Sequence, residues 1–158
     1  MTEEPRYSLR EAQRKLAAQY FNETWDLLEK PERTPEDDTR MIHATHASRC
    51  LWEAVGDASN LAIGEWQISR VYSVLQRAEL AARHGQLSLD HSGEAGQRPF
   101  LMGYAHEALC RAALTSGERD AAGSELSKAT AWLGAVTDEE ERGLLSADLE
   151  QLRAALSG

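Results

Sequence analysis

Proline and cysteine are scarce in this chain, and long apolar runs are missing. The 158 residues include 4 prolines and 2 cysteines. So few prolines agree with a largely helical chain. Cys50 and Cys110 lie in separate apolar stretches far apart in sequence, which does not indicate a disulfide framework. No apolar run approaches the roughly 20 residues that a membrane-spanning helix needs, and the acidic, polar start does not resemble a signal peptide. We therefore expect a soluble, cytoplasmic protein.

Basic residues are also too few for a nucleic-acid-binding surface. The formal net charge is −9, whereas affinity for nucleic acid comes from clustered Lys and Arg side chains that neutralise phosphates. The same charge disfavours binding to an anionic membrane surface. Residues 118–158 carry nine acidic and four basic residues, so the excess of acid is greatest in the last quarter. The length fits a single domain that spans residues 1–158.

A spaced pattern of small and apolar residues recurs three times on helical segments. Its copies are Ala47, Leu51 and Ala54, then Ala81, Gly85 and Ser88, then Ala122, Leu126 and Ala129. The second copy begins 34 residues after the first, and the third begins 41 residues after the second. A period near 34 is that of the tetratricopeptide (TPR) repeat, a helical hairpin that stacks on its neighbours. The pattern predicts stacked helical hairpins with one long loop.

Caps and apolar stripes predict seven helices. Capping boxes are expected at Ser8 with Glu11 and at Thr137 with Glu140, and Pro35 and Pro99 occupy first helical positions. The expected helices cover about residues 8–29, 34–55, 57–75, 78–89, 99–115, 118–134 and 137–156, with the longest loop at residues 90–97. The last helix carries an apolar stripe of Leu145, Leu149, Leu152 and Leu156.

We therefore expect an all-α fold, a TPR-like right-handed α-solenoid of about three helical hairpins plus a C-terminal capping helix. An ordinary helical bundle is the alternative, because any packed pair of Ala- and Leu-rich helices can mimic the spacing.

Two resemblances extend this prediction. The run His106-x₂-Leu109-Cys110-x₂-Ala113, followed by Gly117 and the third copy of the pattern, resembles a tetratricopeptide repeat in its spacing. The segments 46–52, 64–75 and 104–109 resemble a small uncharacterised bacterial family of short TPR-like proteins. That resemblance implies the fold and no chemistry. In the family a Tyr-His pair precedes the Trp, where this chain has Cys50-Leu51.

The third expected helix has polar residues that need partners, because it is apolar on nearly all sides. Glu65, Trp66 and Arg70 lie on it, and Tyr104 and His106 lie on the fifth helix. First helices of such hairpins line the concave surface, and interfaces favour Trp, Tyr and Arg. We expect these five residues to form a groove that binds a protein or peptide partner. The alternative is a polar network inside the protein.

Histidine and cysteine suggest a second, less favoured reading. His43, His46 and Cys50 share one helical stripe, and His106 and Cys110 share another, so these two helices offer ligands that zinc accepts. A small buried residue suits the repeat at position 110, which favours packing, and we expect no metal and no cofactor.

The sequence contains no nucleophile elbow and no glycine-rich phosphate loop. We therefore expect a non-enzymatic TPR-like interaction or scaffold module with an unidentified partner, and self-association stays open. The alternative function is a metal- or small-molecule-binding helical protein, with or without enzymatic activity.

Overall fold

The computed structural model describes residue 2 and residues 4–158, and all the regular structure in this part of the chain is helical. Seven helices follow one another along these residues, and no strand occurs among them. They are α1 (Leu9–Leu28), α2 (Pro35–Val55), α3 (Ala58–Val74), α4 (Ala78–Glu94), α5 (Pro99–Ser116), α6 (Arg119–Leu133) and α7 (Glu139–Ser157). The prediction of an all-α fold is confirmed. No helix within the described residues has both the length and the apolar character to cross a membrane.

Most helix ends lie where their caps predict. Ser8 and Thr34 form capping boxes with the residues three positions later, and Asp57 caps α3. Each cap satisfies amide groups that have no partner inside the helix. The predicted cap at Thr137 is wrong by one residue. Asp138 caps α7, and its carboxylate accepts a hydrogen bond from the Glu141 backbone amide at 2.9 Å.

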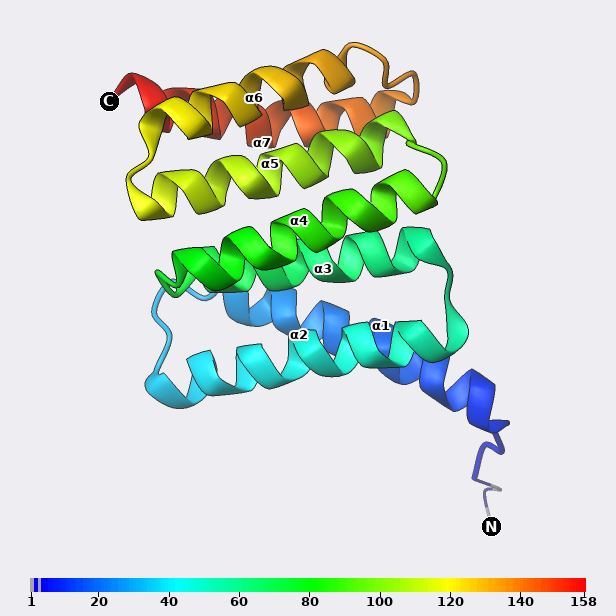
Figure 1. Cartoon of the computed structure of the whole chain (residues 1–158). Coiled ribbons are helices and arrows are strands. Elements are labelled where there is room, and N and C mark those ends of the chain that lie inside the picture. Colours follow the sequence, from blue (N-terminus) through cyan, green and yellow to red (C-terminus); the bar gives the residue numbers. More distant parts are fainter. Residues whose placement is uncertain (1, 3) are drawn as a thin grey trace.

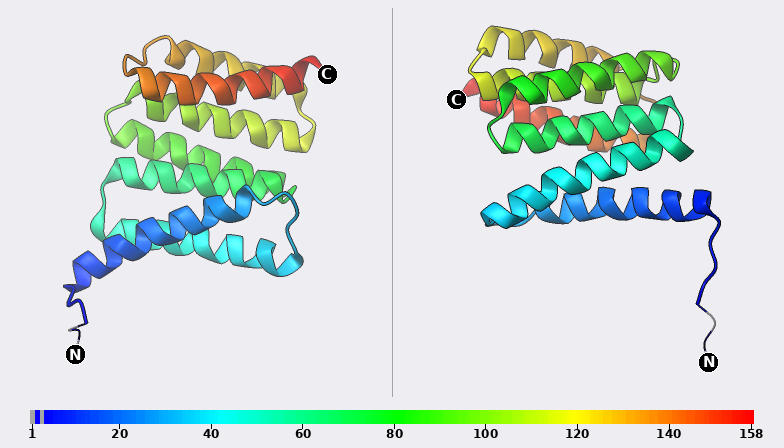
Figure 2. Two further views of the ribbon diagram at one scale, coloured as in Figure 1. Left: turned by 180° about the vertical axis from the view of Figure 1, so that it is seen from behind. Right: turned by 60° about the horizontal axis from the view of Figure 1, so that its bottom comes forward.

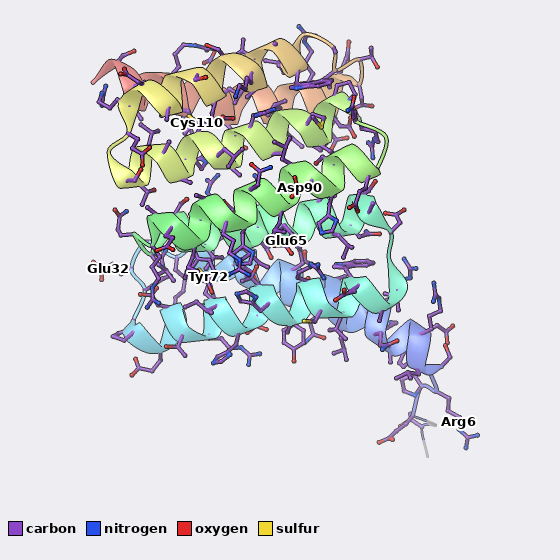
Figure 3. All side chains as sticks on the ribbon, viewed as in Figure 1. Arg6, Glu32, Glu65, Tyr72, Asp90 and Cys110 are labelled. Atoms are coloured by element: carbon purple, nitrogen blue, oxygen red, sulfur yellow. The ribbon has the colours of Figure 1, made fainter. Side chains whose placement is uncertain are left out.

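The long loop predicted at residues 90–97 is mostly helix. α4 continues to Glu94, and Asp90 lies on its ribbon in Figure 3. Ser92 is fully buried, and its hydroxyl donates to the Ser88 carbonyl at 2.8 Å, so its hydrogen-bond donor finds a partner within the helix. Burial of this turn therefore overrides the loop preference of its serine and glycine. The chain turns only after Ala95, where Gly96 has a φ of 90° that glycine adopts without strain.

The helices form three consecutive hairpins that stack in chain order. α1 packs on α2, α3 on α4, and α5 on α6, and each hairpin contacts the next. α7 packs against α5 and α6 at the end of the stack. Figures 1 and 2 show the result as two layers, with α1, α3, α5 and α7 in one and α2, α4 and α6 in the other. Residues far apart in sequence therefore meet along the first layer.

The repeated pattern lies at the helix interfaces in its second and third copies only. Ala81 and Ser88, like Ala122 and Ala129, are buried. In the first copy, Ala54 is exposed, and Ala47 and Leu51 are half-buried, so this register is wrong.

The buried residues of α2 at the corresponding spacing are Met41, Thr45 and Ser48. Ser48 and Ser88 make the same kind of contact, because each hydroxyl donates at 2.8 Å to a carbonyl of the other helix in its hairpin, Ala17 and Ala62 respectively. Ser88 follows Ser48 by 40 residues, and Ala122 follows Ala81 by 41. The structural period is therefore about 40 residues, not 34.

Buried polar side chains join the first hairpin to the second. Gln67 of α3 is fully buried, and its amide nitrogen donates to the Phe21 carbonyl of α1 at 2.9 Å. Its amide oxygen accepts from the Thr45 hydroxyl of α2 at 3.0 Å. Both ends of the amide are thus satisfied by the neighbouring hairpin, as a buried amide requires.

The C-terminal helix covers an apolar face of α5 and α6. Leu145, Leu149 and Leu152 are buried in a cluster with residues of α5 and α6, and Leu156 packs against it. A Cβ atom at Gly103 of α5 would lie 2.5 Å from a methyl carbon of Leu145. Glycine at this position therefore allows α7 to approach α5 closely.

Candidate functional site

An apolar cavity of about 340 Å³ lies along the first layer of helices and opens to the surface. Residues of α1, α3, α4, α5 and α7 line it: Phe21, Trp25, Ala62, Ile63, Trp66, Ser88, Ser92, Phe100, Leu101, Tyr104, Leu144 and Asp148. We call it the aromatic pocket. Helical spacing explains its lining, because residues three or four apart share one face of a helix. Phe21 and Trp25 on α1, and Phe100 and Tyr104 on α5, are such pairs.

The aromatic rings form a continuous row across three helices. The ring centres of Trp25 and Trp66 are 5.5 Å apart, and those of Trp66 and Tyr104 are 5.0 Å apart. Phe21 and Phe100 extend the row at its two ends. Each contact of this kind stabilises the fold by about 0.5–1.5 kcal/mol beyond the burial of area. The stacking of hairpins therefore assembles one aromatic wall from side chains that are distant in sequence.

The fully buried carboxylate of Glu107 on α5 binds the Trp66 side chain of this wall. It accepts a hydrogen bond from the Trp66 indole nitrogen at 2.8 Å and another from the Arg111 guanidinium. Arg70 of α3 makes a longer contact with Glu107 at 3.4 Å. Burial and the nearby charge of Arg111 lower the pKa of Arg70, and Glu107 opposes that effect. The three donors compensate for the cost of burying a charge.

Asp148 of α7 is the charged residue that lines the pocket. One carboxylate oxygen accepts from the Tyr104 hydroxyl at 2.8 Å. Burial and this hydrogen bond raise the pKa of Tyr104 far above its usual value, so the phenol stays a donor. Nη2 of Arg111 lies 3.7 Å from the other oxygen of Asp148, which is too long for a hydrogen bond. This nitrogen has no hydrogen-bond partner among the described residues.

Two of the five predicted groove residues line the aromatic pocket, namely Trp66 and Tyr104. Arg70 does not line it and does not stack on the indole of Trp66, because its guanidinium contacts Glu107 instead. His106 does not face the groove either. It is buried, and its Nδ1 lies 2.7 Å from a carboxylate oxygen of Glu125 on α6. Tyr104 and His106 are two residues apart, which is about half a turn of helix, so Tyr104 faces the pocket and His106 faces α6.

Glu65 also faces away from the aromatic pocket, toward α2 and α4. It is buried, accepts from Nε of Arg49 at 2.8 Å, and lies 2.6 Å from Nδ1 of His84. Burial alone would raise the pKa of Glu65, but the hydrogen bonds from His84 and Arg49 outweigh it and the pKa is lowered. The surroundings of Glu65 therefore match the alternative interpretation, a polar network inside the protein.

The same junction holds a cluster of rings. Nε2 of His46 lies 2.9 Å from the Tyr72 hydroxyl, and the ring of His84 stacks on Tyr72 with centres 5.6 Å apart. Figure 3 shows Tyr72 and Glu65 in this region, between α2 and α4. Burial and the neighbouring His84 lower the pKa of His46. The cluster joins the first two hairpins.

The residues that suggested zinc are dispersed. His43 and Cys50 are exposed on α2, whereas Cys110 is buried between α5 and α6 (Figure 3). Within residues 2 and 4–158, no three His, Cys, Asp or Glu side chains are arranged to hold a metal ion.

Several pocket residues escape prediction from sequence. The pairs of aromatic residues on α1 and α5 are a visible signal, since their spacing places two rings on one helical face. Glu107 is the single acid in the largely apolar run of residues 99–116, which signals a buried and partnered charge. Asp148 gives no such signal, because α7 carries many acids.

Comparison of the chain with protein-family models, with curated proteins and with solved structures finds no match. The resemblance to short TPR-like proteins stays a prediction, and the aromatic pocket is the feature on which a function can be argued.

Proposed function

We propose that the chain is a non-enzymatic interaction module, a TPR-like right-handed α-solenoid whose first layer of helices binds a protein partner. The aromatic pocket carries this proposal. A partner segment would place an apolar side chain in it, against the wall formed by Trp25, Trp66 and Tyr104.

The stacking of hairpins supports the solenoid. Each hairpin contacts the one before and the one after it, and α7 covers the last apolar face, as terminal helices of such stacks do. The period of about 40 residues exceeds the TPR length of 34 and lies in the range of longer helical-hairpin repeats. The likeness to TPR proteins therefore concerns the pairing of helices and not the repeat length.

The state of the polar groups in the pocket supports binding over catalysis. The Trp66 indole donates to Glu107, and the Tyr104 hydroxyl donates to Asp148. The hydroxyls of Ser88 and Ser92 donate to backbone carbonyls. These donors are already used within the protein, so a ligand would be recognised by shape and apolar contact, as in the anchoring pockets of interfaces.

A small apolar molecule is the second candidate ligand. The cavity of about 340 Å³ falls at the lower end of the range for small-molecule pockets, and five helices enclose it.

The first experiment selects peptides from a phage-displayed random library on the purified chain. We expect enrichment of peptides with one aromatic or large aliphatic anchor. Leu144→Glu should abolish their binding, because Leu144 lines the pocket and is 55% exposed, so a carboxylate there charges the rim without disturbing the core. Ala147→Glu is the matched control, since it adds the same charge at an exposed position of α7 that does not line the pocket.

The neutral apolar dye Nile red tests the second candidate on the same variants. Dye binding that Leu144→Glu removes, without any enriched peptide, would replace the protein partner by a small molecule. Failure of both probes, or equal binding by both variants, would overturn a binding role for the pocket.

A further inference from the structure

Three large apolar side chains at the start of α1 and just before it stay well exposed among the described residues. Tyr7, Leu9 and Leu16 are 48%, 76% and 40% exposed, and among the described residues the fourth large hydrophobic side chain with such exposure is Leu144 at the pocket rim. Leu9 and Leu16 are seven residues apart, which places them on one stripe of the helix. Figure 1 shows this end of α1 projecting beyond the stack, and Figure 3 shows Arg6 there. We call residues 6–16 the N-terminal stripe.

The N-terminal stripe and the pocket region have opposite charges. Residues 6–16 contain four basic residues and one acidic residue, whereas residues 139–150 of α7 contain five acidic residues and one basic residue. Asp148 of α7 lines the pocket. An apolar stripe flanked by bases therefore matches an apolar pocket flanked by acids, and such complementarity selects a partner and speeds its approach.

The stripe cannot enter the pocket of its own chain. Leu9 precedes Phe21, the first pocket residue of α1, by twelve residues on a continuous helix. At 1.5 Å per residue this is a rigid separation of about 18 Å. The pocket that Leu9 can reach belongs to another molecule.

We infer that the partner of the aromatic pocket is a second copy of this chain, whose N-terminal stripe docks on the groove with Leu9 as the anchor. This inference rests on the proposed function and names its partner. The contact joins two different surfaces, the stripe of one copy and the pocket of the next, so it is heterologous. Its affinity should fall as salt increases, because exposed charges of opposite sign contribute to it.

The test uses analytical ultracentrifugation of the full chain at low salt, over concentrations from about 5 to 500 µM, the range suited to a small, transient interface. We expect concentration-dependent association that about 0.5 M salt weakens. Leu9→Glu should abolish it from the stripe side, and Leu144→Glu from the pocket side. Leu9 is highly exposed at the start of a helix, where an acid is favourable, so this variant should fold normally. Ala147→Glu should associate at least as strongly as the unchanged chain, because it adds an acid to the acidic segment of α7 at an exposed position that does not line the pocket.

Mixing the two variants gives the sharpest result. The Leu9→Glu chain keeps its pocket and the Leu144→Glu chain keeps its stripe, so together they should form a one-to-one complex although neither associates alone. A monomeric unchanged chain, or a mixture that stays monomeric, would overturn the inference. If the unchanged chain is monomeric while selected peptides still bind it, only the self-association fails and the proposed function stands; if peptides also fail to bind, both are overturned.

Discussion

Replacing Glu107 by alanine should destabilise the protein more than most single substitutions, because this fully buried carboxylate serves three donors. The change would leave the indole of Trp66 without its acceptor and the guanidinium groups of Arg70 and Arg111 without their shared counter-ion. Removing one partner of a buried ion pair typically costs about 3–5 kcal/mol. The two arginine side chains retain 19% and 16% exposure, so water relieves part of the charge, and we expect a loss of about 3 kcal/mol.

Urea unfolding followed by far-UV circular dichroism measures this loss. For a chain of this length the melting temperature should fall by about 6–12 °C. Glu107→Gln should cost less, because the amide oxygen can still accept from the indole of Trp66. Glu150→Ala, at an exposed position of α7, is the control and should change the free energy of unfolding by less than about 0.5 kcal/mol. A loss for Glu107→Ala no larger than that of the control would refute the role assigned to the buried charge.

Three further predictions concern other parts of the fold. Deletion of residues 137–158 should expose the apolar cluster beneath α7 and cause aggregation, which size-exclusion chromatography with light scattering would detect; a stable monomer would contradict it. Ellman's reagent should titrate Cys50 but not Cys110 in the folded protein, because Cys110 is fully buried and burial raises its pKa to about 11; rapid reaction of both thiols would contradict this. The pKa of His46 is lowered in the folded state by burial and by His84, so the unfolded state takes up the proton first. Stability should therefore decrease as the pH falls below 6.5, the ordinary histidine value, and urea unfolding between about pH 7.5 and 5 should show that His46→Gln reduces this slope.

Helix boundaries were largely predictable because their signals are local. Ser8, Thr34 and Asp57 each satisfy amides a few residues away, so nothing distant decides their role. The register of α2 was not predictable in the same way. This helix carries small residues on two faces, with Ala44 and Ser48 on the buried one and Ala47 and Ala54 on the other. Only the position of the neighbouring helices decides which face is covered.

In the candidate site, too, local features were predictable and the packing between helices was not. Trp66 and Tyr104 could be placed on the right helices, but their neighbour Trp25 precedes Trp66 by 41 residues and meets it only because the first two hairpins stack. When a helix is apolar on most sides, its local sequence pattern also does not predict how the helix is rotated about its axis. For that reason the sequence pattern places Glu65 and His106 in the groove, whereas in the structure Glu65 contacts α2 and α4 and His106 contacts α6.

The buried polar contacts between hairpins have a consequence for how the stack opens. Gln67 takes both of its partners from the first hairpin, and Glu107 of the third accepts from Trp66 of the second. If one hairpin detached alone, these buried polar groups would lose their partners. That loss costs free energy in addition to the loss of apolar contacts between neighbouring hairpins. Native-state hydrogen exchange should therefore give one common opening free energy for the amides of the three hairpins, from α1 to α6. α7 packs on its neighbours through a stripe of leucines, and its hydrogen bond from Tyr104 to Asp148 is only partly buried, so opening of α7 strands no fully buried group. Its amides should therefore exchange through a separate and easier sub-global opening.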